Sequence, residues 1–135
     1  AMRSRAGALS ELGAAEFARQ RSPLLVAEAA PKQVIDEVER LFADSVRMPS
    51  YQWACNSMAE TDHRDSLASI VVPTLVVCGD EDRVTPPKLS QELAEGIKGS
   101  TLAYVKGAGH LANQEHPADF NDIVARFAKS LTERV

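Results

Sequence analysis

An aspartate and a histidine stand in two loops from which they could act on one substrate. Asp82 lies in the loop Gly79-Asp-Glu-Asp82-Arg-Val-Thr, and His110 ends the loop Lys106-Gly-Ala-Gly-His110. Each loop follows a predicted strand, and open parallel sheets carry reactive groups in the loops after the carboxyl ends of strands. Adjacent parallel strands lie ~5 Å apart, so the two side chains can meet. An aspartate beside a histidine fixes the imidazole tautomer and makes the histidine a competent general base.

A strand–helix–strand unit must position these loops. The segment Thr74–Cys78 is short and β-branched, which predicts a buried parallel strand. Thr85 followed by two prolines predicts a helix with Thr85 as its N-cap and Pro86 in the first turn. This helix is expected to end at Gly99, and Thr101–Val105 is the second strand. The whole has the length of a βαβ crossover, about 30 residues.

The remaining elements are predicted to be helices. The first 62 residues contain no convincing strand, and Ser10 is expected to begin the first helix. A second helix places apolar residues on one face, at Val34, Ile35, Val38, Leu41 and Phe42. A third begins at Pro49-Ser50, and the last helix begins near Pro117.

Two parallel strands alone make an incomplete sheet. Parallel sheets occur almost only with several strands and with both faces covered. Two strands would expose long unpaired edges, which favour aggregation. The pattern therefore indicates the end of a larger sheet.

The order of these motifs resembles the C-terminal part of α/β-hydrolases. The resemblance covers about residues 62–132 and rests on four motifs: two loops and two helix starts. The loops are G-x-x-D, at Gly79 and Asp82, and G-x-G-H, at Gly107, Gly109 and His110. The helix starts are T-P-P, at Thr85, Pro86 and Pro87, and E-x-P-x-x-F, at Glu115, Pro117 and Phe120. It implies that Asp82 is the acid and His110 the general base of a Ser-Asp-His triad. It further implies a helical lid at residues 1–62 and the C-terminal lobe of the core at residues 63–135. Within the family, the motifs most resemble 3-oxoadipate enol-lactone hydrolases.

The sequence departs from the family pattern at the nucleophile. No G-x-S-x-G elbow occurs, and Ser57, Ser66 and Ser69 lie on predicted helical segments. We therefore expect a partial α/β-hydrolase fold that lacks the lobe with the nucleophile. The complete enzyme would act on a small-molecule ester or lactone without a cofactor, and the chain alone would be inactive. Dehalogenation and C–C bond hydrolysis use the same acid and base and remain open.

Two other interpretations concern partners. The chain could be a non-catalytic remnant that associates with a second copy, in which case two chains would pair their strands as a homodimer. Alternatively, a separately encoded N-terminal half could complete the enzyme.

Other residues carry weaker predictions. Trp53 could line a substrate pocket in the lid or pack in the core. Asp80 and Glu81 are expected to be solvated, and Glu115 is expected to anchor the start of the last helix, where an acid suits the helix dipole. The three histidines and two cysteines share no metal-ligand spacing, so no metal site is predicted.

Charge and hydropathy exclude further classes. The chain has 15 basic and 19 acidic residues, a net charge of −4, which argues against nucleic-acid binding through net charge. The longest apolar run, Ile70–Cys78, is far short of the about 20 residues that a membrane span requires. The basic N-terminus has no apolar run after it, so no secretory signal is predicted. With two unpaired cysteines, a reducing cytoplasm is the expected location.

Overall fold

The chain forms two compact units in a computed structural model that describes residues 2–133. The first unit comprises the described residues up to Leu24 together with Pro31–Asp62. The second comprises Leu25–Ala30 together with the described residues from His63 onward. The short segment Leu25–Ala30 thus belongs to a different unit from the residues on either side of it.

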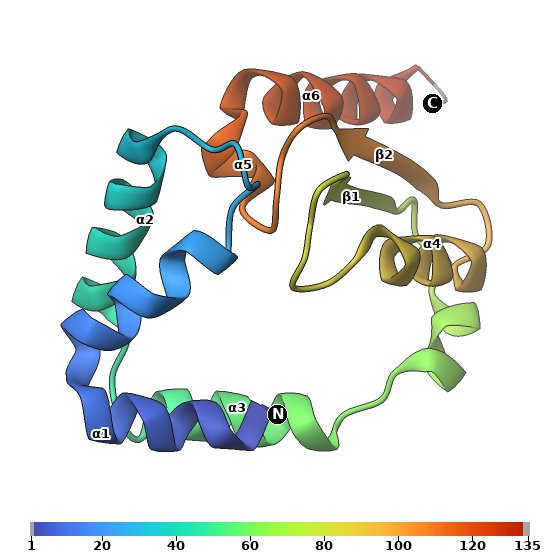
Figure 1. Ribbon diagram of the computed structural model, residues 1–135. Coiled ribbons are helices and arrows are strands. Elements are labelled where there is room, and N and C mark those ends of the chain that lie inside the picture. Colours follow the sequence, from blue (N-terminus) through green and yellow to red (C-terminus); the bar gives the residue numbers. More distant parts are fainter. Residues whose placement is uncertain (1, 134–135) are drawn as a thin grey trace. The chain divides into compact units, whose positions relative to one another are not determined.

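The first unit is helical. It contains α1 (Met2–Arg21), the 3-10 turn η1 (Ser22–Leu24), α2 (Lys32–Ser45) and α3 (Ser50–Glu60). In Figure 1, α1 bends sharply, and the bend is at Gly13, whose φ of 75° and ψ of 165° are not helical. Glycine suits this position because a φ above zero is strained for residues with a Cβ.

The predicted start of the first helix at Ser10 is wrong. The structure begins α1 at Met2, eight residues earlier. The added turns consist largely of alanine, arginine and leucine, which are strong helix formers. Helix propensity therefore extends the helix past a serine that could have capped it.

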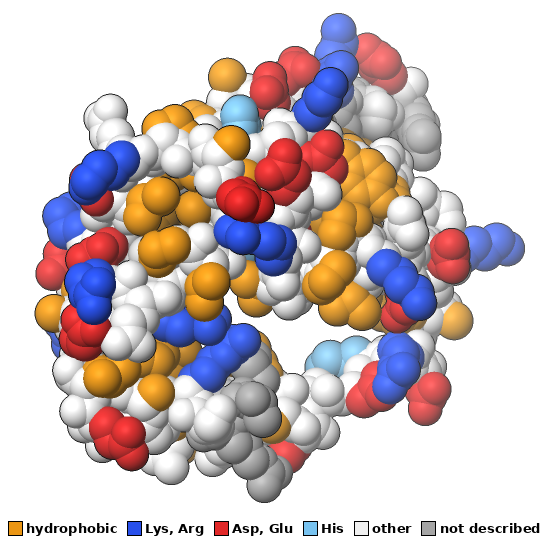
Figure 2. Space-filling model, in the orientation of Figure 1, with side chains coloured by type: hydrophobic (Ala, Val, Ile, Leu, Met, Phe, Trp, Pro, Cys, Tyr) orange, Lys and Arg blue, Asp and Glu red, His pale blue; other side chains and the backbone are white. Residues whose placement is uncertain are grey.

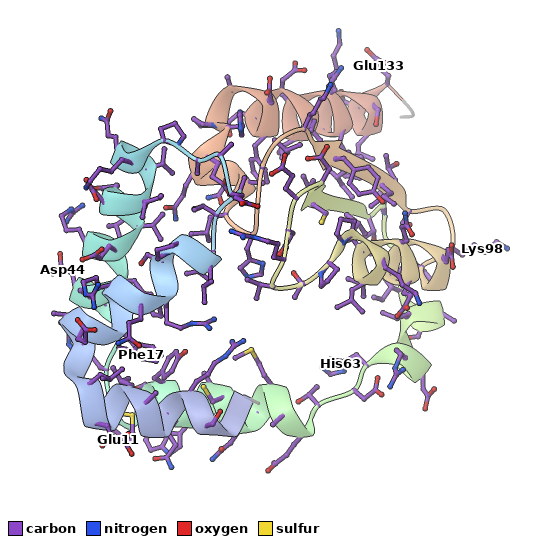
Figure 3. The ribbon with its side chains drawn as sticks, in the orientation of Figure 1. Glu11, Phe17, Asp44, His63, Lys98 and Glu133 are labelled. Carbon is purple, nitrogen blue, oxygen red and sulfur yellow. The ribbon has the colours of Figure 1, made fainter. Side chains whose placement is uncertain are left out.

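An aromatic cluster forms the core of the first unit. Phe17 is only 2% exposed and packs edge-on against Phe42 and Tyr51, with ring centroids 5.8 and 5.5 Å away. Figure 3 labels Phe17 near the bend of α1. Leu9 and Val46 complete the buried part of this cluster. The cluster joins all three helices, because its rings come from α1, α2 and α3.

Replacing Phe17 with alanine is therefore expected to destabilise the first unit by about 3–5 kcal/mol. The loss combines the removed apolar surface with the cavity left between the three helices. Urea unfolding followed by circular dichroism would measure it. Leu24→Ala is the matched control, because Leu24 is half exposed in the same unit and should cost less than about 1 kcal/mol. Equal losses in the two variants would show that the aromatic cluster is not the core.

The second unit contains a parallel sheet with helices around it. Its elements, in chain order, are η2 (Arg64–Ser69), β1 (Leu75–Gly79), α4 (Pro87–Gly96), β2 (Thr101–Val105), α5 (Ala112–Glu115) and α6 (Pro117–Thr132). The two strands pair in parallel, from Leu75 opposite Thr101 to Gly79 opposite Val105. Figure 1 shows the sheet between α4 and α6. The βαβ unit predicted from the sequence is therefore present, although α4 ends at Gly96 rather than at Gly99.

The core of the second unit lies beside the carboxyl ends of the strands. Val105, Ala108 and Ala112 are buried and pack against Val77, Phe120 and Ile123. The loop after β2 passes so close to β1 that a Cβ on Gly79 would lie 2.2 Å from the carbonyl oxygens of Ala108 and Gly109. The absence of a side chain at Gly79 lets this loop lie against the strand.

Within residues 2–133, no helix combines the length and the apolar character that crossing a bilayer would require.

Candidate active site

The loops after β1 and β2 bring Asp82 and His110 together. Both strands end at the same edge of the sheet, because Gly79 and Val105 are paired in register. The Nδ1 atom of His110 lies 2.9 Å from Oδ2 of Asp82. The Asp82 side chain is 5% exposed and that of His110 is 34% exposed. The acid is thus buried, while part of the imidazole remains accessible.

The Asp82 carboxylate is held by four hydrogen bonds. Its Oδ1 atom accepts from the backbone N–H groups of Val84 and Thr85, at 2.8 and 2.9 Å. Its Oδ2 atom accepts from the Thr85 hydroxyl at 2.8 Å and pairs with His110. Burial raises the pKa of Asp82, but the hydrogen bonds from His110, Thr85 and Val84 outweigh burial and hold the pKa below its ordinary value.

An ionised Asp82 determines which nitrogen of His110 carries the proton. A carboxylate only accepts hydrogen bonds, so Nδ1 of His110 must be the donor in their contact. In the neutral imidazole, Nε2 then keeps its lone pair. The arrangement therefore gives His110 a basic nitrogen directed away from Asp82.

Thr85 has a role that the sequence did not predict. The cap position of α4 is Pro86 and no side chain caps the helix, so the prediction that Thr85 is the N-cap is wrong. The Thr85 hydroxyl instead donates to Asp82 Oδ2 and lies 3.2 Å from His110 Nδ1. Because α4 begins at Pro87 and Pro86 occupies its cap position, the Thr85 hydroxyl is not needed at the helix end. It can therefore bond to Asp82.

Asp80 joins the two loops. It is exposed, as predicted, but its Oδ1 atom also accepts a hydrogen bond of 2.6 Å from the backbone N–H of Gly107. The backbone N–H of Glu81 donates to the carbonyl of Ala108 at 2.9 Å. These contacts fix the loop that carries Asp82 against the loop that carries His110.

Glu115 connects the His110 loop to a distant segment. One carboxylate oxygen accepts from the backbone N–H of Gly109 at 2.9 Å, and the other accepts from that of Ala27 at 2.7 Å. A Cβ on Gly109 would lie 2.4 Å from the backbone of Val26, so the two segments are in close contact. The sequence predicted only that Glu115 anchors the start of the last helix; in the structure Glu115 is the last residue of α5, and α6 begins at Pro117 with no side-chain cap. No local signal could reveal a partner 88 residues away.

Two hollows adjoin the pair. A cavity of about 160 Å³ lies directly beside Asp82 and His110 and is also lined by Cys78, Asn113 and Phe120, among others. A larger groove of about 390 Å³ has a mostly apolar lining from Leu67, Leu89 and Leu93. Thr85 and Ser90 line both, so the groove adjoins the cavity.

The remaining predicted residues lie elsewhere. Trp53 is on α3 in the first unit and is 66% exposed, so it is not a core residue there. Cys55 and Cys78 are free and buried. Among residues 2–133, no group of three or more His, Cys, Asp or Glu side chains could hold a metal ion.

Comparison with known proteins identifies the family. The profile of the alpha/beta hydrolase family matches residues 2–123. The chain belongs to the α/β-hydrolase family. The family predicted from the sequence is therefore confirmed, and the parallel strand–helix–strand unit followed by a helix confirms a partial fold of this class.

Similar α/β-hydrolases include a lactonase of known sequence and one of known structure. The chain is 33% identical to the AB hydrolase superfamily protein YisY of Bacillus subtilis, over 74% of the chain and 43% of the relative. It is 37% identical to 3-oxoadipate enol-lactonase 2 of Acinetobacter baylyi, over 68% of the chain and 35% of the relative. The enol-lactonase structure from Burkholderia xenovorans LB400 matches with a TM-score of 0.83 and 24% identity, over 93% of the chain and 49% of that structure. The chain thus spans less than half the length of these α/β-hydrolases.

Proposed function

We propose that this chain supplies the acid and the base of a Ser-Asp-His hydrolase that acts on an ester or a lactone. The observation that carries the proposal is the 2.9 Å contact between His110 Nδ1 and the buried carboxylate of Asp82. Family membership supports these roles, because the triad of α/β-hydrolases follows the chain order Ser, Asp or Glu, then His. The proposed roles are Asp82 as the triad acid and His110 as the general base.

The proposed reaction uses His110 twice. Its Nε2 atom takes the proton of a serine hydroxyl while the serine oxygen bonds to the substrate carbonyl carbon. Asp82 stabilises the resulting imidazolium through the Nδ1 contact. His110 then returns the proton to the alcohol oxygen as the bond from that oxygen to the carbonyl carbon breaks, and an acyl-serine remains. A water molecule next gives a proton to His110 while its oxygen bonds to the acyl carbon. His110 passes that proton to the serine oxygen as the acyl–serine bond breaks, which releases the carboxylic acid and the free serine.

The serine is proposed to come from a segment outside this sequence. None of the seven glycines of the chain belongs to a G-x-S-x-G elbow. That elbow also provides part of the oxyanion hole, which stabilises the charge on the carbonyl oxygen. We therefore expect the 135-residue chain alone to show no ester or lactone turnover.

The lactone part of the proposal draws on the relatives. Several proteins that are similar to this chain bear the name enol-lactonase, and a solved structure is among them. Trp53 is the proposed substrate contact from the first unit, since it presents a large exposed aromatic surface on α3. Such surfaces are frequent in binding sites, because an indole ring offers apolar contact area at low entropic cost.

Recovering the coding sequence upstream of this chain tests the proposed function. The longer protein should contain a G-x-S-x-G elbow and hydrolyse p-nitrophenyl acetate or a simple lactone, while the 135-residue chain should not. Sustained turnover by the purified chain alone would overturn the proposal. So would a longer protein with the elbow and no hydrolysis of either substrate type.

The unpaired sheet edges favour a second candidate function, self-association. Within the described residues the sheet has two strands, so each strand leaves one edge without a partner. A second copy of the chain could cover these edges. A dimer whose mass does not change on dilution, with no elbow encoded upstream, would favour this function over hydrolysis.

A further inference from the structure

A buried nitrogen atom at the end of α1 lacks a partner. The Nε atom of Arg21 is buried and makes no hydrogen bond, and it is the one such side-chain atom within residues 2–133. Folded proteins pair nearly all buried polar groups, so an unpaired one is a candidate contact for a ligand. This Nε–H donor belongs to a charged guanidinium, and hydrogen bonds from charged groups are the stronger ones.

A second arginine, Arg5, lies close enough to Arg21 for its positive charge to act on it. In a straight helix, residues 5 and 21 would lie about 24 Å apart along the axis. The non-helical Gly13 lies between them and turns the two halves of α1 toward each other (Figure 1). Burial lowers the pKa of Arg21, and the positive charge of Arg5 lowers it further. No Asp or Glu is among the groups whose charge acts on Arg21 in the described residues, so two like charges meet without an acid.

Tyr51 supplies a third polar group from α3. Burial raises the pKa of the Tyr51 phenol, and Cys55 raises it further, while Arg21 and Arg5 oppose the change. The phenol is therefore protonated near neutral pH and can donate a hydrogen bond. Figure 2 shows basic side chains gathered over α1 near the centre of the view. The three groups together offer donors and positive charge.

We propose that Arg21, Arg5 and Tyr51 bind the carboxylate group of a small organic acid. The Nε–H of an arginine and one of its Nη–H groups form a planar fork that matches the two oxygens of a carboxylate. The atom left unpaired in the structure is the Nε member of that fork. A bound carboxylate would pair this atom and reduce the repulsion between the two arginines. The site lies wholly in the first unit and does not rest on the proposed hydrolase function.

Thermal unfolding of the whole chain in sodium succinate and in sodium chloride of equal ionic strength tests the site. A ligand that binds only the folded state raises the melting temperature, by about 3–6 °C at roughly tenfold excess over Kd. We expect this rise for the unmodified chain. Arg21→Met should abolish it and should also raise the melting temperature in chloride, because the variant removes the buried Nε–H donor that has no partner and the repulsion with Arg5. Arg21→Lys, which keeps the charge without the fork, should reduce the rise.

Arg19→Lys is the matched control, because Arg19 lies on the same helix and is paired with Glu16. It should leave the succinate effect unchanged. The ring resonances of Tyr51 should shift with succinate, while those of Tyr104, which lies on β2 in the second unit, should not. An equal rise in the unmodified chain and in Arg21→Met would overturn the site. A larger rise with phosphate than with succinate would overturn the assignment to a carboxylate.

Discussion

Replacing His110 with alanine is expected to lower ester or lactone hydrolysis by the complete enzyme by about a thousandfold or more. The His110 imidazole donates its Nδ1–H to Asp82 and is the proposed base. Without the imidazole, no base remains to accept the serine proton. Asp82→Asn should cause a loss of similar order, because an amide N–H facing Nδ1 would select the wrong tautomer. Initial rates with a p-nitrophenyl ester, at matched protein concentration, measure both losses.

His63→Ala is the control for this experiment. His63 is exposed and immediately precedes η2, where Figure 3 labels it. This variant should retain full activity and its melting temperature, and circular dichroism should show that the His110→Ala and Asp82→Asn proteins are folded at the assay temperature. A His110→Ala enzyme that retained a tenth of the original rate would remove His110 from the proposed mechanism.

Replacing Gly79 with alanine is expected to destabilise the second unit by about 2–4 kcal/mol. The new Cβ would lie 2.2 Å from two backbone carbonyl oxygens in the loop before His110. A backbone cannot move aside as the end of a flexible side chain can, so the loop must shift as a whole. The pairing of His110 with Asp82 should be lost with it, which the imidazole Nδ1–H resonance would report.

Gly7→Ala is the matched control for this substitution. Gly7 lies on α1, and a Cβ there would meet nothing within 4 Å. Alanine should stabilise that helix by up to about 1 kcal/mol, since its helix propensity exceeds that of glycine. In urea unfolding, the free energy of unfolding should therefore fall for Gly79→Ala and rise for Gly7→Ala. A Gly79→Ala protein as stable as the unmodified chain would contradict the close approach of the loop to β1.

The sequence predicted the parts of the site that depend on local patterns. The two strands follow from short apolar segments bounded by proline or glycine, and their parallel pairing places Asp82 and His110 at one edge. The contacts of Thr85 and Glu115 could not be predicted in this way. Thr85 has a residue type that suits both a helix cap and a hydrogen bond to Asp82, and only the position of His110 decides between them. Glu115 accepts a hydrogen bond from the backbone N–H of Ala27. Since almost every residue has a backbone N–H, the residue type at position 27 does not indicate this contact.

The sequence also left the shape of α1 open. Gly13 in a helical pattern is compatible with a continuous helix, a break or a bend. Its φ of 75° makes it a bend, and this brings together Arg5 and Arg21, which no spacing rule pairs.

The segment Leu25–Ala30 affects how the chain responds to cleavage. Three hydrogen bonds hold it in the second unit. The backbone N–H of Ala27 donates to Glu115. Arg83 donates to the carbonyl of Val26, and the backbone N–H of Leu111 donates to that of Leu25. Val26 and Ala27 are almost fully buried there. A protease cut after Asp62 therefore produces two polypeptides that still share one folded unit, so the fragments should copurify rather than separate. Residues 63–133 produced alone would lack a buried part of their own core.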